Sequence, residues 1–381
     1  MTVKRTSEDP SVSPGFEEVA EEFARNFTER DELGAAFAAV RDGVVVVDLW
    51  GGVADRSTGR PWSRDTLQLI FSGTKGLTAM CLLILLDRGE LELDAPVERY
   101  WPGFGKPEIL VSDIVSHTAR LPGIDLPVTV EQLTDDRHMA SLLASQAPSE
   151  DPRARLCYHA LTYGWLCGEL VRRIDGRSVG RFFAEEIARP LGLELWIGLP
   201  AELESRVSTL ELAESWPQSA HFRPETFARD ELLRSIWGNP PVWDIQTFPW
   251  NTPAIHRAEM AAVNGIGTAR SIAWLYANLG RLISAEALRI GSTALSDGYD
   301  EAHGAPSRFG VGFQLQAEDI QFGPAAEAFG HAGAGGSIHG AWPEHRIGFS
   351  YTMNLMRDDQ EVDPRADALL GALHRSLSRR P

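Results

Sequence analysis

The sequence predicts a mixed α/β protein of α+β character, in which one antiparallel sheet is assembled from both ends of the chain. Two apolar runs near the N-terminus, 34–40 and 44–50, flank an Asp-Gly pair that is typical of a β-hairpin turn. Near the other end, three runs are typical of strands: 308–316, 329–342 and 346–354. Because helical patterns fill the middle, we predict that helices flank this sheet and that a mostly helical lobe lies beside it.

The chain divides into three predicted parts, which are a disordered polar tail over 1–14, a sheet domain over 15–105 with 300–381, and a helical domain over 106–299. Apolar residues from Phe16 to Phe27 recur at helical spacing, which predicts an amphipathic first helix. A helix predicted over 72–88 is apolar over most of its surface, so we expect it to be central.

Composition and charge exclude several classes of partner. The 381 residues are 43% hydrophobic and carry a net charge of −17, with no basic patch, which argues against nucleic acid and anionic membranes. The first residues lack the apolar core of a signal peptide, and the longest apolar run, 77–86, is too short to span a bilayer. We therefore expect a cytoplasmic protein that does not enter a membrane.

Cysteine and histidine patterns predict neither a metal nor a cofactor. The three cysteines form no C-x-x-C pair, so we expect no zinc ribbon and no disulfide framework. The ten histidines form no H-E-x-x-H, and no glycine-rich nucleotide motif is present. The sequence leaves the oligomeric state open.

A nucleophile is predicted at Ser72, in the tetrad Ser72-Gly73-Thr74-Lys75 at the head of the apolar helix. Residues three apart share one helical face, so the Lys75 amine can reach the Ser72 hydroxyl. A lysine acts as a base only when it is neutral, and burial in apolar surroundings lowers its pKa from about 10.4. The chain has only three lysines against 33 arginines, and it places one of them here.

The residues around this tetrad resemble the β-lactamase and penicillin-binding-protein superfamily. Residues 71–76 are similar to the first motif of class C β-lactamases and closer still to family VIII carboxylesterases. Residues 116–122 resemble the S-H-T-x-G-L-P stretch of these proteins, with Arg120 where glycine is usual. Tyr158-His159-Ala160 and His331-Ala332-Gly333 stand where the superfamily has Y-x-N and K-T-G. The resemblance implies a β-lactamase/DD-peptidase-like fold and a serine hydrolase.

Two departures from these motifs bear on the substrate. Ala160 replaces the asparagine of Y-x-N, and His331 replaces the lysine of K-T-G. In β-lactamases these positions help to hold the amide side chain and the carboxylate of the antibiotic. Their loss favours an esterase, which does not need to hold a carboxylate.

By this resemblance, Tyr158 acts with Lys75 as a general base pair on Ser72. Beside a cationic lysine, we expect the pKa of Tyr158 to fall below about 10. Which of the two groups takes the Ser72 proton is left open, because a coupled pair titrates together.

The resemblance also implies an oxyanion hole formed by the amides of Ser72 and Ala334. Gly333 and Gly335 would let the main chain of this segment approach a substrate closely. For His331, contact with the substrate and a structural role at the start of a strand are equally supported.

Two other features allow alternative interpretations. Gly176-Arg177-Ser178-Val179-Gly180 matches a nucleophile elbow, but a helix pattern precedes it, so Ser178 is interpreted as a helix N-cap. Three tryptophans lie in the Pro-rich segment 237–253 and form either an acyl-binding wall or an ordinary packed loop: Trp237, Trp243 and Trp250.

The predicted function is hydrolysis of small-molecule carboxylic esters through an acyl-enzyme on Ser72. One alternative is an acyltransferase that uses the same acyl-enzyme, and another is a weak β-lactamase or DD-peptidase. The non-enzymatic alternative is a catalytically silent binding protein of the penicillin-binding type. The sequence does not separate the first two, because they share the acylation step.

Overall fold

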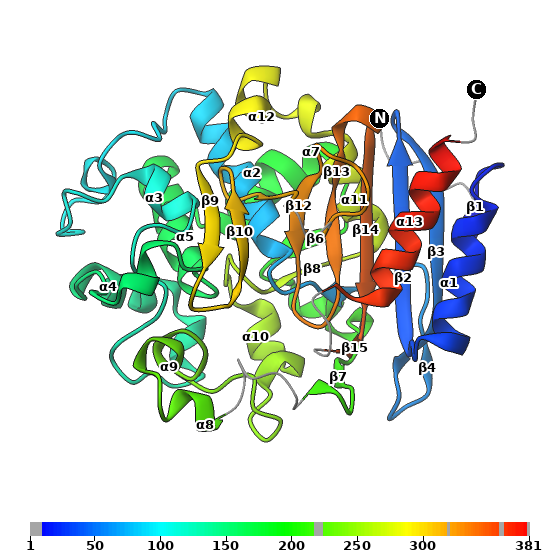
Figure 1. The fold of residues 1–381 in the computed structure, drawn as a ribbon, viewed down its shortest axis with the longest axis horizontal. Coiled ribbons are helices and arrows are strands. Elements are labelled where there is room, and N and C mark those ends of the chain that lie inside the picture. Colours follow the sequence, from blue (N-terminus) through cyan, green and yellow to red (C-terminus); the bar gives the residue numbers. More distant parts are fainter. Residues whose placement is uncertain (1–9, 217–223, 318–320, 358–361, 379–381) are drawn as a thin grey trace.

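The computed structural model describes residues 10–216, 224–317, 321–357 and 362–378. In these ranges the main sheet has 10 strands in the order β1-β3-β2-β14-β13-β12-β11-β10-β9, with β4 paired to β3. Figure 1 shows β9 and β10 at one edge and β1 at the other. The strands are β1 (Ser11–Val12), β2 (Gly34–Arg41), β3 (Val44–Asp55), β4 (Arg60–Pro61), β9 (Ser296–Asp300), β10 (Ala305–Phe309), β11 (Gln314–Leu315), β12 (Phe329–Ala332), β13 (Ile338–Trp342) and β14 (Ile347–Met353).

The predicted antiparallel sheet from both chain ends is confirmed. β2 and β3 form the expected hairpin, and Asp42 and Gly43 take positive φ values of 51° and 73° at its turn. β2 also pairs with β14 from Arg41↔Ile347 to Ala35↔Met353, which joins the N-terminal hairpin to the C-terminal strands.

Two predicted strands are each divided in the structure. The run 329–342 forms β12 and β13, because Gly335 and Gly336 turn the chain between them at φ values of 86° and 117°. Glycine adopts such left-handed conformations without a steric penalty. The run 308–316 likewise divides into β10 and β11 at Gly312, whose φ is 72°.

Alternate residues of β2 face two separate cores, as the two-residue repeat of a strand requires. Phe37 and Ala39 pack with α1 (Glu17–Glu29) and α13 (Pro364–Ser378) on one face. Ala38 and Val40 belong to the larger core on the other face, which includes α2 (Thr74–Asp87) and α11 (Ala269–Ala277).

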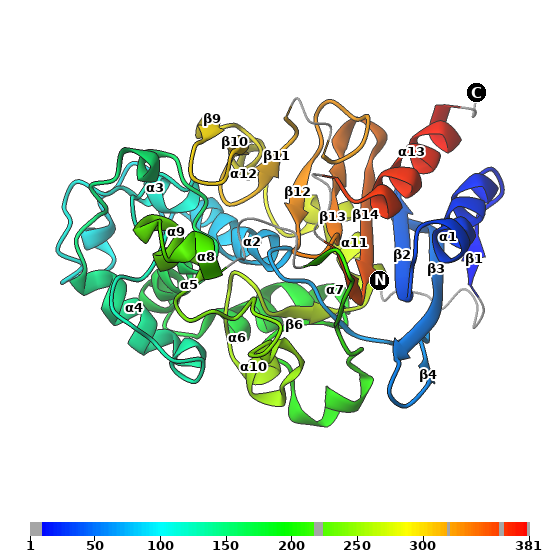
Figure 2. The same ribbon diagram turned by 60° about the horizontal axis from the view of Figure 1, so that its bottom comes forward.

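Helix α2 is central, as predicted for 72–88. Twelve of its 14 residues are buried, and it packs against α5 (Thr162–Asp175), α6 (Val179–Phe183) and α12 (Ala285–Gly291) and against strand β12. In Figure 2 it runs between the helical lobe and the sheet. The remaining helices are α3 (Val111–Val115), α4 (Asp136–Ser145), α7 (Arg189–Leu191), α8 (Pro224–Phe227), α9 (Glu231–Trp237) and α10 (Pro253–Arg257).

Within the described residues, two short sheets accompany the main one. One has three strands, β5 (Gln68–Leu69), β8 (Gly265–Gly267) and β6 (Leu195–Ile197), and the other pairs β7 (Glu211–Leu212) with β15 (Leu355–Met356). In the described part of the chain, every helix is too short or too polar to span a lipid bilayer.

The predicted domain limits differ from the packing in two places. Residues 11 and 12 of the predicted disordered tail pair with Asp48 and Val47 of β3, while 1–9 lie outside the described residues. Helix α11, which falls within the predicted helical domain, packs on β14 and β2 of the sheet. A long apolar helix pattern does not reveal which layer the helix covers, so the limits at 105 and 300 remain predictions.

Candidate active site

Ser72 lies between strand β5 and helix α2, directly after a residue with an unusual backbone. Phe71 has a φ of 45°, in the left-handed region that bulky side chains rarely adopt. Its ring packs on Trp243 and Trp250 at centroid distances of 5.5 and 5.2 Å. Such strain persists only where surrounding contacts impose it, and it clusters at functional sites. The aromatic packing therefore holds Ser72 at the head of α2.

Lys75 is one turn further along α2, and its side chain is fully buried. Its Nζ lies 3.2 Å from Ser72 Oγ, 2.8 Å from the carbonyl oxygen of Ala160 and 3.3 Å from that of Ala262. Burial holds the pKa of Lys75 well below its usual range. The structure thus brings the predicted serine and lysine together and favours a neutral amine.

Tyr158 completes the group, because Lys75 Nζ lies 4.6 Å from its ring centroid and the Ser72 side chain is near enough to its phenol to influence the pKa of Tyr158. The expectation of a lowered tyrosine pKa is wrong. Burial raises the pKa of Tyr158 above its usual value, and the Ser72 side chain opposes this only in part. A neutral Lys75 supplies no positive charge to stabilise a phenolate, so Tyr158 is a neutral phenol.

Two side chains hold the loop that carries Tyr158. The amide of Tyr158 donates to Asp300 Oδ2 at 2.7 Å, and the amide of His159 donates to His117 Nδ1 at 3.0 Å. His117 is therefore a structural hydrogen-bond acceptor in the 116–122 stretch. Arg120 in the same stretch has a φ of 59°, the conformation for which glycine would be favoured at this motif position.

The turn between β12 and β13 lies against the segment that leads to Ser72. A Cβ on Gly333 would come within 2.3 Å of the carbonyl oxygen of Ile70, so only glycine fits there. The Gly333 amide donates to the carbonyl of Ser337 at 2.8 Å, and the Gly336 amide donates to that of Gly333 at 3.3 Å. These contacts fix the turn that contains Ala334 against the segment that leads to Ser72, and the role of the Ala334 amide in an oxyanion hole stays a prediction.

His331, at the K-T-G position, is buried and uncharged. Its Nδ1 lies 2.7 Å from the carbonyl oxygen of Ala332, and its ring centroid is 6.0 Å from that of Tyr158. Burial lowers the pKa of His331 to about 3. His331 is therefore next to the predicted catalytic group, but at neutral pH it is not a cation that could hold a carboxylate.

The three tryptophans of the predicted wall take different positions. Trp250 is fully buried and Trp243 is 4% exposed, and their ring centroids lie 5.1 Å apart in the packing behind Phe71. Trp237 is half-buried, and its Nε1 donates to His303 Nε2 at 3.1 Å. The first two therefore act as core packing in this structure, and Trp237 is the one at the edge of the site.

Ser178 lies apart from this group, as expected for a helix cap. It precedes α6 and its Oγ accepts a hydrogen bond from the Arg181 amide, while it donates to Glu259 Oε1 at 2.9 Å.

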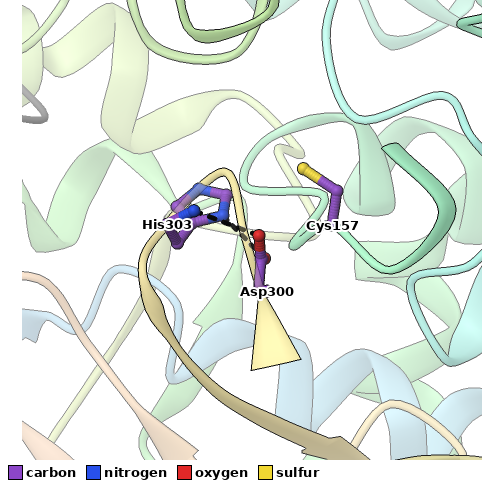
Figure 3. A group of neighbouring side chains, drawn as sticks. All are labelled: Cys157, Asp300 and His303. Carbon is purple, nitrogen blue, oxygen red and sulfur yellow. Dashed lines mark hydrogen bonds and ion pairs between the residues drawn. The ribbon is translucent and has the colours of Figure 1, made fainter. Parts of the chain in front are cut away.

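Two residues near Tyr158 were not anticipated from the sequence. Asp300 ends β9, and His303 follows in the turn to β10, with His303 Nδ1 2.7 Å from Asp300 Oδ2 (Figure 3). Cys157 lies beside them, and the three ligand atoms are within 4.8 Å of one another. Asp300 and Tyr158 are 142 positions apart, and an isolated D-x-x-H has no recognisable spacing signal, so the contact requires the fold.

Comparison with known proteins is consistent with this geometry. The Beta-lactamase family model matches residues 21–373. The esterase/β-lactamase LipL of Mycobacterium tuberculosis (strain ATCC 25618 / H37Rv) is 33% identical over 362 residues, which are 91% of this chain and 82% of LipL.

Solved structures are similar over nearly the whole chain. A family VIII carboxylesterase superposes with a TM-score of 0.87 at 34% identity, over 96% of this chain and 98% of that one. A penicillin-binding protein homologue from Caulobacter crescentus gives a TM-score of 0.85 at 33% identity, over 97% and 100%. EstA from Arthrobacter nitroguajacolicus Rue61a gives 0.84 at 30% identity, over 96% and 98%.

The fold and the Ser-x-x-Lys site define a serine hydrolase of the β-lactamase fold. The chain belongs to the Beta-lactamase family. The predicted resemblance to family VIII carboxylesterases and to penicillin-binding proteins is thereby confirmed, and so is the prediction of an enzyme of this type.

Proposed function

We propose that the protein hydrolyses uncharged carboxylic esters through an acyl-enzyme on Ser72, with Lys75 as the base. The observation that carries the proposal is the set of partners of Lys75 Nζ, which are two carbonyl oxygens and one hydroxyl. A neutral amine has two N–H donors and one lone pair. Because carbonyls only accept, the two donors point to Ala160 and Ala262, and the lone pair is directed at the Ser72 hydroxyl.

In the acylation step, Lys75 Nζ accepts the Ser72 proton while Ser72 Oγ bonds to the ester carbonyl carbon. The amides of Ser72 and Ala334 stabilise the negative charge on the carbonyl oxygen. The C–O bond to the leaving alcohol then breaks, and the alcohol oxygen takes a proton. Water attacks the acyl-enzyme in the same way, which releases the acid and restores Ser72.

Tyr158 has the role of proton donor to the leaving alcohol. It touches Ser72 and Lys75, and its raised pKa keeps the proton on the phenol. The proton that Lys75 accepted can replace the one that Tyr158 gives up. This assignment divides the predicted base pair into a base, Lys75, and a donor, Tyr158.

The substrate class follows from the two motif positions at which this chain lacks a cation and an amide side chain. His331 is neutral where the motif has a lysine, and Ala160 offers a methyl group where the motif has an amide. An ester needs neither a carboxylate anchor nor an amide-binding side chain. Relatives named as esterases, including EstB of Burkholderia gladioli, support the same reaction. Action on a small molecule in the cytoplasm, without nucleic acid, is part of the proposal.

The test is turnover of p-nitrophenyl butyrate and of the β-lactam nitrocefin. Ser72→Ala should lower kcat/KM for the ester at least a thousandfold (about the scale of removing a catalytic serine). Ser178→Ala is the matched control, and it should stay within about threefold of the wild type while the lost cap costs about 1 kcal/mol of stability. Efficient nitrocefin turnover without ester turnover, or full activity of Ser72→Ala, would contradict the proposal.

A further inference from the structure

The β9–β10 hairpin connects the main chain of Tyr158 to the indole of Trp237 through two side chains. Asp300 Oδ2 accepts both the Tyr158 amide and the His303 Nδ1 proton at 2.7 Å. Asp300 Oδ1 accepts the amides of Ala302 and His303 at 3.0 and 3.1 Å. Asp300 is 2% exposed, so the loss of one of these hydrogen bonds would leave a buried polar group without a partner, which is costly.

The charge of Asp300 is stabilised in this position. Burial tends to raise its pKa, but the hydrogen bonds from His303 and from the Tyr158 and His303 amides outweigh burial, and its pKa is lowered. The three groups Cys157, Asp300 and His303 could also be considered as a metal site. Since each Asp300 oxygen already accepts two hydrogen bonds, the geometry fits an anchor better than a ligand set.

His303 has a defined tautomer. Its Nδ1 carries the proton that Asp300 accepts, so its Nε2 is an acceptor, and Trp237 Nε1 donates to it at 3.1 Å. The edge of the His303 ring lies on Tyr158 at a centroid distance of 5.9 Å and an interplanar angle of 82°. His303 therefore contacts both Tyr158, the proposed proton donor, and the half-buried Trp237.

We propose that Asp300 and His303 are positioning residues of the ester site, where Asp300 fixes Tyr158 and His303 fixes Trp237 as a wall that limits the acyl chain. The inference rests on the proposed function, since it names what positions the donor and what sets substrate size. The role of His303 can be tested alone, because a change of its Nε2 acceptor leaves the Asp300 contact with the Tyr158 amide in place, whereas Asp300 holds both Tyr158 and His303.

Paired variants of His303 separate its two hydrogen bonds. In His303→Asn the side-chain amide can still donate to Asp300, but residue 303 no longer offers an acceptor at the position of Nε2 to the Trp237 indole. In His303→Gln the longer side chain can place an oxygen where Nε2 was, which restores an acceptor for Trp237. We expect His303→Asn to raise kcat/KM for p-nitrophenyl octanoate relative to the acetate by about tenfold. We expect His303→Gln to return this ratio towards that of the wild type.

Asp300→Asn should lower kcat on acetate and octanoate alike by about 10- to 100-fold, because a misplaced donor affects every ester. KM should change less than threefold. Asp297→Asn is the matched control on the same strand. Its carboxylate is exposed and pairs with Arg308 at 3.2 Å, so kcat should be unchanged. If Asp300→Asn lowers only the melting temperature, the proposed role of Asp300 is wrong.

An NMR readout does not depend on catalysis. The Trp237 indole N–H resonance, assigned by its loss in Trp237→Phe, should shift in His303→Asn and return in His303→Gln. Labelling of Ser72 by a fluorophosphonate, located by mass spectrometry, tests the proposed function separately in every variant. If Ser72 is not labelled in the wild type, the proposed function fails. If Ser72 is labelled but the resonance and the chain-length ratio do not move in His303→Asn, the role of His303 is refuted.

Discussion

Replacement of Lys75 by arginine or by methionine tests whether an uncharged amine activates Ser72. Arginine keeps a positive charge at every workable pH and has no lone pair to accept a proton. Methionine has a similar length and no charge. If the function of Lys75 is to accept the Ser72 proton, both variants lose it, although one is a cation and the other is apolar.

The size of the effect follows from what each variant removes. A positioned general base contributes about 10²- to 10⁴-fold to a rate, so kcat/KM for p-nitrophenyl butyrate should fall by that range in both variants. Methionine also leaves the carbonyls of Ala160 and Ala262 without the Lys75 donor, at a cost of about 1–3 kcal/mol each. Burial of the polar Lys75 amine itself costs free energy, and methionine does not carry this cost. The two effects offset each other in part, so Lys75→Met should fold.

Lys106 provides a matched control. It is 4% exposed, its Nζ donates to the carbonyls of Phe104, Leu143 and Ala144, and burial lowers its pKa, as for Lys75. Lys106→Met should therefore cost stability in the same way and leave kcat/KM within about threefold of the wild type.

The pH dependence of kcat/KM has a defined sign. Because burial lowers the pKa of Lys75, the amine is neutral above that pKa and becomes protonated as the pH falls through it. Activity should therefore decline on the acid side, since the protonated amine has no lone pair.

One result for the Lys75 variants would refute the reasoning. It is a kcat/KM of Lys75→Arg within threefold of the wild type, measured at a matched fraction of folded protein.

Two further predictions concern stability. Glu32 and Asp363 both form ion pairs with the buried Arg365. Burial raises the pKa of Glu32 from 4.5 to about 7. Because the folded protein holds this proton more tightly than the unfolded chain, the free energy of unfolding should fall by up to about 3 kcal/mol as the pH rises from 4.5 to above 7. Thermal unfolding of Glu32→Gln should show a flatter pH dependence, and an unchanged slope would contradict this. Arg120→Gly should raise the free energy of unfolding by about 1 kcal/mol in a urea titration, because its φ is 59°, and a destabilised variant would contradict this.

Local sequence patterns were sufficient to predict those helices and strands whose formation depends mainly on neighbouring residues. The hairpin at Asp42-Gly43, the amphipathic α1 and the central helix α2 each follow from residue spacing and turn chemistry. The sheet from both chain ends followed from the order of these elements. The division of 329–342 at Gly335 was missed, because a glycine in a strand pattern does not reveal its φ before the partner strands are known.

Only those residues of the candidate site that belong to a short sequence motif could be predicted from the sequence. Ser72 and Lys75 are predicted from one short motif and Tyr158 from a second, and the structure brings the three side chains together. The pKa of Tyr158 was predicted in the wrong direction, because its shift depends on how deeply both side chains are buried. Trp250 was considered for the substrate wall, but it is fully buried. Neither burial nor the Asp300 contact can be derived from residue spacing.

The central claim is that the acyl group of an ester is transferred to the Ser72 hydroxyl. Rapid quenching of the enzyme with p-nitrophenyl butyrate, followed by peptide mass spectrometry, tests it most directly. We predict a butyryl group on the peptide that contains Ser72, present in the wild type and absent in Ser72→Ala. A butyryl group on Ser178 instead, or steady ester turnover by Ser72→Ala, would contradict the account.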